Sequence, residues 1–397
     1  MNFAELVTSN GLFCDGDWIE KKDQDPNGAV RLIQLADIGV CEFKDKSNRF
    51  ITEAKAEELH CTYLQKGDIL IARLPDPLGR ACIFPLDGKY ITAVDIAIVR
   101  IARDDVNPKY VMYMLNSPRF RNEIKQYESG TTRKRISRKN LDKIEFEIPS
   151  LSEQNCIVAR IEELFSELDN GVETLRKTKQ QLAVYRQAVL RDAFAGLDTF
   201  VSLQSISERI FDGPFGSNLK TSDYTSSGIR VVRLENLKDG WFDDSKQSFV
   251  TPEKYDAISS HTVYPTDLIM STFIADSIKV CQMPEYVGFA VNKADCIGIR
   301  LKSNYVQRYV MYFLMTKNAY NSLVHEVHGA TRPRVNTKQI RGIQIPVCDL
   351  SAQRKIVVNI ESRLSVCDSI EKTVDTALQQ AEAMRQSILK QAFEGSL

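Results

Sequence analysis

The chain has 397 residues, 43% of them hydrophobic and 26% charged, which is an ordinary composition for a globular protein. Its 52 lysines and arginines balance 52 aspartates and glutamates, so the formal net charge is zero. This balance excludes a strongly basic nucleic-acid binder, and any affinity for nucleic acid must come from local basic patches or from a partner subunit. No apolar run approaches the roughly 18 residues of a membrane-spanning helix. The nine cysteines form no C-x-x-C pair, and this spacing favours reduced thiols in the cytoplasm.

An internal repeat governs the organisation of the chain. Residues 110–196 recur at 309–395, so the period is close to half of the whole length. Because a period of this length excludes a solenoid, the sequence predicts two copies of one unit, each a globular domain followed by a long helix. The repeated motifs include Tyr110-Val-Met-Tyr113 with Tyr309-Val-Met-Tyr312, and Gly130-Thr-Thr-Arg133 with Gly329-Ala-Thr-Arg332.

Residues 1–150 are predicted to form the first globular domain, with short strands followed by a helix. Asp87-Gly88 is a hairpin-turn signal between two apolar runs. Asn107-Pro108 is typical of the N-cap and first residue of a helix, which we expect to extend to about Tyr127. The predicted strands are the apolar or β-branched runs at 31–35, 68–71 and 95–99.

The rest of the chain is predicted to contain one long helix at 151–197, a second mixed domain at 198–349 and another long helix at 350–397. Ser152 and Ser351 are candidate N-caps of the long helices, and Gly196 and Gly395 are candidate stops. In the second domain we expect strands at 229–234, 268–271 and 297–301, and a helix from about Val306.

Apolar residues recur every seven positions in both long helices, which is the pattern of a coiled coil. In the second helix we expect a companion series to fill the other seam position: Ile356, Ile370, Ala377 and Met384, with Arg363 as the exception. Two amphipathic core helices are the alternative, but the unbroken length of both patterns favours a paired seam. The main series is Ile161, Leu168, Leu175, Leu182 and Val189 in the first helix, and Ile360, Cys367, Val374, Ala381 and Ile388 in the second.

The short connections between domains and helices predict how the helices pair. The first helix begins where the first domain ends, and the second helix must run back from the second domain to pair its apolar face. The predicted fold class is therefore α+β, with two similar mixed α/β domains separated by two long antiparallel helices in a pseudo-twofold arrangement. At a rise of 1.5 Å per residue, a helix of this length spans about 65 Å.

Basic residues gather at equivalent places in the two copies. Residues 130–139 hold five basic side chains and no acid, and the matching segment 329–341 also lacks acids. Guanidinium groups, hydroxyls and exposed backbone N–H groups suit phosphate contacts, and recurrence in both copies favours DNA binding over a merely solvated face. The candidates are Arg133, Lys134, Arg135, Arg138 and Lys139 in the first copy, and Arg332, Arg334 and Lys338 in the second.

A glycine loop from Gly213 is a second candidate for DNA contact. It ends in three polar residues, Ser217, Asn218 and Lys220, which could donate hydrogen bonds to phosphates. An ordinary turn is the alternative interpretation.

Patterns that resemble catalytic motifs have simpler explanations. Pro75-Asp76 with Asp87-Gly88-Lys89 loosely matches the P-D…D-x-K nuclease pattern, but a turn explains it and the second copy lacks it. Asn107-Pro-Lys-Tyr110 resembles the N-P-P-Y motif of adenine methyltransferases, yet helix initiation accounts for it. No S-adenosylmethionine glycine motif, P-loop or H-E-x-x-H is present, and His325 and His328 lack a third ligand. We therefore predict no catalytic residue and no metal site.

The chain resembles the specificity subunits of type I restriction-modification systems, and the resemblance covers essentially all of it. The segments together are specific, although each alone is weak. They are Asp15-Gly-Asp-Trp-Ile-Glu20, Val30-Arg-Leu-Ile-Gln-Leu-Ala-Asp37, Gly213-Pro-Phe-Gly-Ser217, Gly228-Ile-Arg-Val-Val-Arg233, the Gly-Thr-Thr-Arg and Gly-Ala-Thr-Arg loops, and the Ile-Pro…Gln helix starts at 148–154 and 345–353.

The resemblance implies two target-recognition domains, each reading one half of a bipartite, asymmetric site in double-stranded DNA. The helices would act as a spacer and as a docking surface for two methylation subunits, with restriction subunits joining them. Adenine methylation and ATP-driven cleavage, with S-adenosylmethionine, ATP and Mg²⁺, would belong to those partners, so this chain would be a non-catalytic subunit without a cofactor. The neutral net charge suggests that the partners supply part of the phosphate grip. The alternatives are a structural coiled-coil adaptor without sequence preference and, less favoured, a fused nuclease or methyltransferase.

Overall fold

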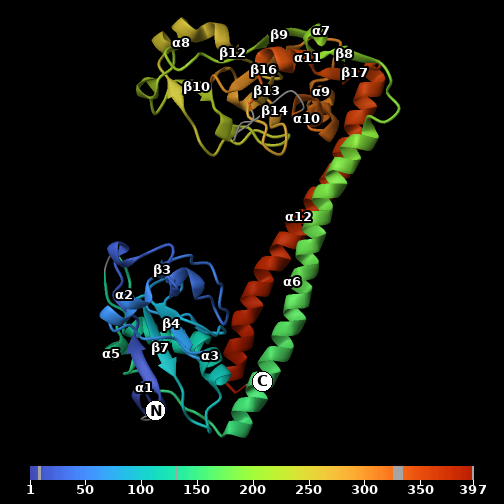
Figure 1. The fold of residues 1–397 in the computed structure, drawn as a ribbon. Coiled ribbons are helices and arrows are strands. Elements are labelled where there is room, and N and C mark those ends of the chain that lie inside the picture. Colours follow the sequence, from blue (N-terminus) through green and yellow to red (C-terminus); the bar gives the residue numbers. More distant parts are fainter. Residues whose placement is uncertain (8–9, 131–132, 325–333, 396–397) are drawn as a thin grey trace. The chain divides into compact units, whose positions relative to one another are not determined.

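The computed structural model describes residues 1–7, 10–130, 133–324 and 334–395. The chain divides into two compact units: unit 1 comprises Met1–Leu175 with Thr376–Leu397, and unit 2 comprises Arg176–Asp375. Each unit contains one globular domain and one part of each long helix (Figure 1). None of the described helices combines the length and the apolar character needed to cross a membrane.

The globular domain of unit 1 is built on two small sheets. The larger is antiparallel with the order β1-β7-β4-β5, and the smaller has the order β3-β2-β6, in which β2 and β6 are parallel. The strands are β1 (Leu12–Asp15), β2 (Val30–Ile33), β3 (Phe50–Ile51), β4 (Ile69–Ala72), β5 (Ala81–Ile83), β6 (Tyr90–Thr92) and β7 (Ile96–Arg100).

The predicted hairpin at Asp87-Gly88 is wrong. The two strands that flank this turn belong to different sheets, because β5 pairs with β4 and β6 pairs with β2. Pro85 follows β5 closely and has no backbone N–H to extend a ladder, so the chain leaves the sheet there. Gly88, with a φ of 138°, therefore turns the chain from one sheet to the other.

The helix predicted from Asn107 to about Tyr127 is in fact two helices. Asn107 caps the first by accepting the N–H of Lys109 at 2.9 Å, as expected. The helix ends because Pro118 excludes the helical conformation at Ser117, whose hydroxyl then caps the next helix. The helices of this domain are α1 (Phe3–Leu6), α2 (Glu53–Glu58), α3 (Pro108–Asn116), α4 (Pro118–Gln126) and α5 (Arg138–Leu141).

Strand β4 lies between two layers of the unit 1 core. Ile69 and Ile71 pack on the side of α3 and α4, whereas Leu70 and Ala72 pack with Ile33 of β2. Since successive side chains of a strand point to opposite faces, both faces of β4 are covered. This explains why every position of the strand is apolar and buried.

Unit 2 repeats this architecture, which confirms the predicted fold class of two similar mixed domains. The sheet orders are β14-β13-β16-β9 and β11-β10-β15-β12, with an added pair β17-β8. The predicted strand at 229–234 stops at Val232, because Leu234–Asn236 forms a 3-10 turn.

The strands of unit 2 are β8 (Phe200–Ser202), β9 (Ser207–Phe211), β10 (Ile229–Val232), β11 (Phe249–Val250), β12 (Thr262–Val263), β13 (Leu268–Ser271), β14 (Val280–Gln282), β15 (Ala290–Asn292), β16 (Cys296–Leu301) and β17 (Gln344–Pro346). Its short helices are α7 (Leu203–Ile206), α8 (Pro252–Ile258), α9 (Gln307–Leu314), α10 (Lys317–Val324) and α11 (Thr337–Gly342).

The two long helices are α6 (Leu151–Ala193, 43 residues) and α12 (Leu350–Phe393, 44 residues). Both caps lie two residues before the predicted serines. Ser150 accepts the N–H of Glu153, and Asp349 accepts the N–H of Ala352 at 2.9 Å. Ser152 and Ser351 are inside the first turns, because the helices start immediately after these earlier caps. Gly196 and Gly395 have φ values of 79° and 78°, as expected for residues that end a helix.

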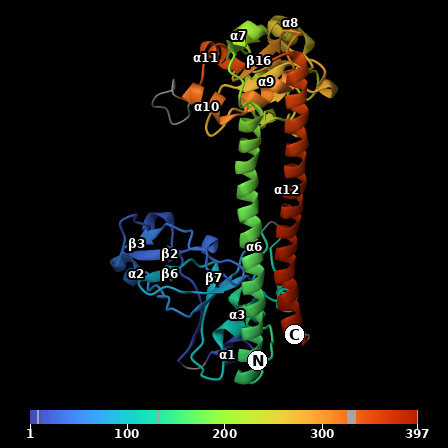
Figure 2. The ribbon, with the colours of Figure 1, turned by 90° about the vertical axis from the view of Figure 1, so that its right-hand side faces the viewer.

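Within each unit, α6 and α12 run antiparallel (Figures 1 and 2). In unit 1 Asp169 of α6 pairs with Arg385 of α12, and in unit 2 Arg186 of α6 pairs with Glu371 at 2.7 Å. The first part of one helix thus meets the last part of the other. All ten residues of the main heptad series are buried or half-buried, from Ile161 and Ile360 at 0% exposed to the half-buried Leu168 and Leu175.

The predicted companion series in α12 is wrong for two of its four residues, whereas Ile356 and Ala377 are half-buried. Ile370 and Met384 are 40% and 54% exposed, so they do not lie in the seam. The second seam position is instead a series displaced from the main one by three residues, and charged residues interrupt its apolar pattern. This series is Val357, Leu364, Glu371, Leu378, Arg385 and Ala392, all buried or half-buried.

Candidate nucleic-acid interface

In each unit one turn gathers the segments that were predicted to contact DNA. We call it the central turn: residues 93–95, between β6 and β7 of unit 1, and residues 293–295, between β15 and β16 of unit 2. The chain after β1 and the chain after β9 both pack on this turn. The basic segments are joined to it through the residues that follow β4 and β13, because the N–H groups of Arg73 and Thr272 donate to the carbonyls of Asp95 and Asp295.

In unit 1 the chain after β1 lies directly against the central turn. The N–H of Gly16 donates to the carbonyl of Ile96 at 2.8 Å, and the N–H of Asp17 donates to Thr92 at 2.8 Å. A Cβ on Gly16 would lie 2.3 Å from the carbonyl oxygen of Ala93. Only glycine permits this approach, so the backbone position is fixed.

The basic segment of unit 1 is attached to the same region. The backbone of Ile136, which is 1% exposed, donates to the carbonyl of Arg73 at 3.1 Å. Arg73 and Arg138 both form ion pairs with Asp15, the last residue of β1, at 3.2 and 3.5 Å. The Arg138 guanidinium also lies 5.6 Å from the ring centre of Phe13. These contacts tie the basic segment to β1.

Unit 2 has the same construction with different side chains. The N–H of Val335 donates to the carbonyl of Thr272 at 2.9 Å, which matches the bond between Ile136 and Arg73. Arg334 pairs with Asp295 of the central turn at 2.5 Å. A Cβ on Gly213 would lie 2.2 Å from the backbone of Lys293, so this glycine also makes an obligatory close approach.

The predicted DNA-binding residues differ in whether their side chains already form an ion pair within the protein. Lys134 pairs with Glu128, and Arg138 and Arg334 are engaged in the pairs described above. Within the described part of the chain, no hydrogen bond or ion pair engages the exposed side chains of the remaining candidates of the basic segments: Arg133, Arg135, Lys139 and Lys338. Arg332, with His325 and His328, lies outside the described residues.

The glycine loop of unit 2 is an exposed turn with one buried anchor. Ser217, Asn218 and Lys220 are exposed, whereas Leu219 is 2% exposed and packs with β10 and β15. The N–H of Lys220 donates to Asp223 at 2.7 Å. The loop is therefore held at both ends and presents its polar residues to solvent.

Two buried ion pairs that the sequence did not suggest stabilise the same sheets. Asp68, 1% exposed, pairs with Arg100 at 2.8 Å, and Asp267 pairs with Arg300 at 2.6 Å. The hydrogen bonds that the guanidinium groups donate to these carboxylates raise the pKa of both arginines. Each pair joins the residue before β4 or β13 to the end of β7 or β16, so it fixes the strands that carry the central turn.

Two exposed aromatic residues that were not among the predicted DNA contacts also lie close in the chain to the glycines that pack on the central turn. Trp18 is 70% exposed and Phe215 is 61% exposed. The signal for them was a glycine two residues before an aromatic residue in both copies, as in Gly16-Asp-Trp18 and Gly213-Pro-Phe215. It was hidden because the offset here is 197 rather than the 199 of the main repeat.

The nuclease-like and methyltransferase-like patterns do not converge on a site. Asp87 pairs with Lys66 at 3.2 Å and Lys89 pairs with Glu53 at 2.5 Å, so these two residues are engaged with different partners. Asn107 acts as a helix cap, as stated above. Among the described residues there is no group of three histidines, cysteines, aspartates or glutamates that could hold a metal ion.

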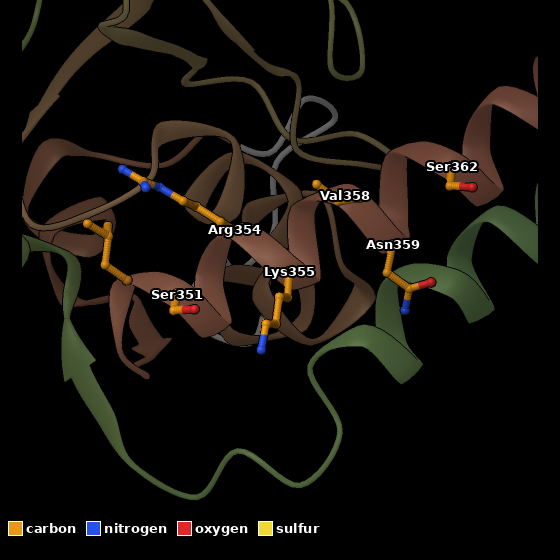
Figure 3. Close-up of a pocket in the computed structure, with 7 residues that line it drawn as sticks. Ser351, Arg354, Lys355, Val358, Asn359 and Ser362 are labelled. Carbon is orange, nitrogen blue, oxygen red and sulfur yellow. The ribbon is translucent and has the colours of Figure 1, made fainter.

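A separate surface lies on the first turns of α12. Figure 3 shows side chains that project from this helix around a shallow pocket, including Arg354, Lys355 and the 65% exposed Val358. Every residue that lines the pocket comes from α12 itself. The pocket is therefore a feature of the helix surface and not a cavity between elements.

Comparison with known proteins identifies the family. A model of the type I restriction modification DNA specificity domain matches residues 14–182 and again residues 219–380, which together form most of the chain. The chain belongs to this family. Each match begins beside the glycine that packs on the central turn, or in the glycine loop, and ends within a long helix. The family's unit is thus a globular domain with most of the helix that follows it.

Individual relatives are distant. The chain is 26% identical to the StySPI specificity subunit of Salmonella potsdam over 74% of this chain and 66% of that one. It is 23% identical to the EcoKI specificity subunit of Escherichia coli K12 over 72% of this chain and 65% of that one. The chain thus matches about two thirds of the length of these relatives.

Solved structures support the fold. A chain from a structure on the assembly and conformational transition of a type I restriction-modification system is similar over 98% of this chain and 99% of that one, with a TM-score of 0.70 and 16% identity. The HsdS subunit of Thermoanaerobacter tengcongensis is similar over 98% of both chains, with a TM-score of 0.50 and 15% identity.

Proposed function

We propose that this chain is the DNA-recognition subunit of a type I restriction-modification complex. It reads a bipartite, asymmetric site in double-stranded DNA, with one globular domain on each half. The observation that carries the proposal is the repeated construction at the central turn: in both units a basic segment and a glycine-held loop meet on the same sheet edge. Recognition of two different half-sites requires phosphate-contacting segments that are the same in both domains. It also requires neighbouring residues that differ between the domains and can read different bases.

The chemistry of modification and cleavage is assigned to partner subunits. Methylation subunits, expected to number two, supply S-adenosylmethionine-dependent methylation of adenine, and restriction subunits supply ATP- and Mg²⁺-dependent cleavage. Because the net charge of this chain is zero, we expect the partner subunits to supply some of the basic residues that contact the DNA phosphates. A fused nuclease or methyltransferase is disfavoured, because Asp87 and Lys89 are held apart in separate ion pairs.

The outer face of α12 is the surface that we assign to a protein partner. Val358, Val366 and Ile370 are 65%, 57% and 40% exposed, and their spacing of eight and four residues places them along one side of the helix. Figure 3 shows Val358, the first of these three residues. Exposed apolar side chains along one side of a helix are typical of protein-binding surfaces. A structural adaptor without DNA specificity would share this feature, so it does not separate the two functions.

Methylome sequencing separates them. A host without related systems receives the proposed methylation subunits with or without this chain, and its DNA is sequenced for N6-methyladenine. We expect one bipartite, asymmetric motif to become methylated only when the chain is present. Methylation of the same motif without the chain, or of no defined motif with it, would contradict the proposed function. The chain alone should bind no S-adenosylmethionine in a calorimetric titration.

A further inference from the structure

We propose that Trp18 and Phe215 are equivalent DNA-contacting residues, whose rings pack against the apolar faces of nucleotides in the bound DNA. The inference deepens the proposed function and rests on it.

Strand register establishes that the two residues are equivalent. In unit 1 Cys14 pairs with Ile98, and in unit 2 Phe211 pairs with Gly298. The central strands correspond in turn, because Leu70 pairs with Ile98 and Ile269 pairs with Gly298. Four residues beyond the first pair on each edge strand lie Trp18 and Phe215, so both aromatic residues occupy one structural position.

Both rings are exposed although their backbones are fixed. Gly16 and Gly213, two residues before the rings, pack so closely on the central turn that a Cβ would lie 2.3 and 2.2 Å from backbone atoms. A ring on a mobile loop would lose conformational entropy when it bound a ligand. A ring on a fixed backbone is already held in place, so this cost is smaller.

The second exposed tryptophan, in contrast, has no aromatic counterpart in the other unit. Trp241, 57% exposed, corresponds to Glu42, because the neighbouring bridges Leu237–Phe242 and Ile38–Phe43 are equivalent. Exposed aromatic rings at one position in two diverged copies require a common reason. Solvent exposure of large apolar rings opposes solubility, so a shared ligand is the physical reason that fits.

The surroundings identify the ligand as nucleic acid. Asp15 lies three residues before Trp18 and receives ion pairs from Arg73 and Arg138, and Glu20, two residues after Trp18, pairs with Lys22 at 2.6 Å, so basic side chains lie on both sides of Trp18 in the chain. Phe215 is followed by the exposed Ser217 and Asn218. A ring beside cationic and hydroxyl groups matches a nucleotide, whose base or sugar offers an apolar face next to a phosphate.

The test uses the intrinsic fluorescence of the full chain. It has only two tryptophans, Trp18 and Trp241, so the Trp241→Phe variant leaves Trp18 as the sole fluorophore. This variant is titrated with a fluorescein-labelled duplex that contains the motif found by methylome sequencing, and with a scrambled duplex. Duplex anisotropy reports binding, and tryptophan emission reports the environment of Trp18.

We expect the emission of Trp18 to be quenched in parallel with the rise in anisotropy. Trp18→Ala and Phe215→Ala should each weaken binding of the motif duplex at least about fivefold, the scale of one lost ring contact. Trp18→Phe should retain most of the affinity, because unit 2 has phenylalanine at the same position. Tyr185→Ala is the matched control, since Tyr185 is 45% exposed on α6 and should have no effect.

Binding by anisotropy with unchanged Trp18 emission, and with both alanine variants within twofold of the parent, would overturn the inference and leave the proposed function standing. Absence of any duplex binding by the full chain, alone and with its methylation subunits, would overturn both. Circular dichroism of each variant shows whether a loss of affinity reflects a loss of fold. Comparison of Trp18→Phe with Trp18→Ala then shows whether binding depends on an aromatic ring at this position.

Discussion

At the scale of single residues, the basic segments were predictable and their partners were not. Five cations without an acid in residues 130–139 are visible in the sequence. The acids that bind some of them are remote: Asp15 is more than one hundred positions from Arg138, and Asp295 reaches Arg334 across the domain. Such pairs depend on tertiary contacts, so the sequence could not separate free charges from engaged ones.

The free and engaged cations should behave differently with DNA. Replacing both Arg133 and Arg135 by alanine should weaken binding to all duplexes alike and reduce the slope of log K against log salt by up to about 2, because each lost phosphate contact removes about 0.9. Lys134→Ala is the control, since its charge is already paired with Glu128 and its effect should be smaller. A change in the preferred sequence on mutating the two arginines would refute a phosphate role.

Asp17, next to Trp18, predicts a pH dependence of stability. Burial raises the pKa of this carboxyl group from its ordinary 3.8 to about 6. The hydrogen bond that the Thr62 N–H donates to the carboxylate lowers the pKa, but by less. The folded state therefore holds the proton more tightly than the unfolded chain, and the free energy of unfolding falls as the pH rises from about 4 to about 6. Because the group is only half-buried, we expect this loss to be about 1 kcal/mol.

Asp17→Asn tests this expectation. Its amide oxygen can still accept the Thr62 N–H, but it does not ionise. Urea unfolding followed by Trp18 fluorescence, in the Trp241→Phe background, should show a smaller decline of stability from pH 4 to pH 6 than the parent shows. Parallel pH profiles for the two proteins would show that Asp17 does not titrate in this range.

At the scale of elements, the sequence predicted strands and helix starts well and misjudged where elements end or pair. Pro118 breaks the helix after α3, a rule that could have been applied to the sequence alone. The pairing of β6 with β2 instead of β5 could not, because it is a contact between distant segments. The second helical seam was missed because Glu371 and Arg385 interrupt its apolar pattern, although both are neutralised across the seam.

The charges in the seam predict a specific coupling in unit 2. Arg186 contacts both Asp368 and Glu371, at 2.8 and 2.7 Å, with 29% of its side chain exposed. Arg186→Glu should lower the midpoint of urea unfolding through repulsion, and adding Glu371→Arg should restore part of the loss. Since these groups are partly exposed, the coupling should be about 0.5–1 kcal/mol. A double variant no more stable than the sum of its single changes would rule out the pair as a determinant.

At the scale of the whole molecule, the repeat predicted two similar units and an antiparallel helix pair, because both follow from the period and the short connections. The sequence could not predict the convergence at the central turn, since the glycine and aromatic positions recur with an offset that differs from the main repeat. The division into two domains and two helices could therefore be predicted from the sequence, whereas the position of the candidate DNA contacts within each domain could not.

The helices are expected to set the spacing between the two half-sites. Deleting seven residues from each helix keeps both seams in phase and shortens each helix by about 10 Å, close to three base-pair rises. In a methylome of the reconstituted system, the non-specific spacer should shrink while both half-sites stay the same. An active complex with an unchanged spacer would show that the helices are not the ruler.

The central claim is that each globular domain reads its own half-site independently. The most direct test replaces residues 200–347 by the corresponding domain of a relative that recognises a different motif, and determines the methylome with the same partner subunits. The account predicts that one half of the methylated motif changes to that of the donor while the other half is retained. A motif in which both halves change together would contradict it, because the two domains would then read DNA as one unit.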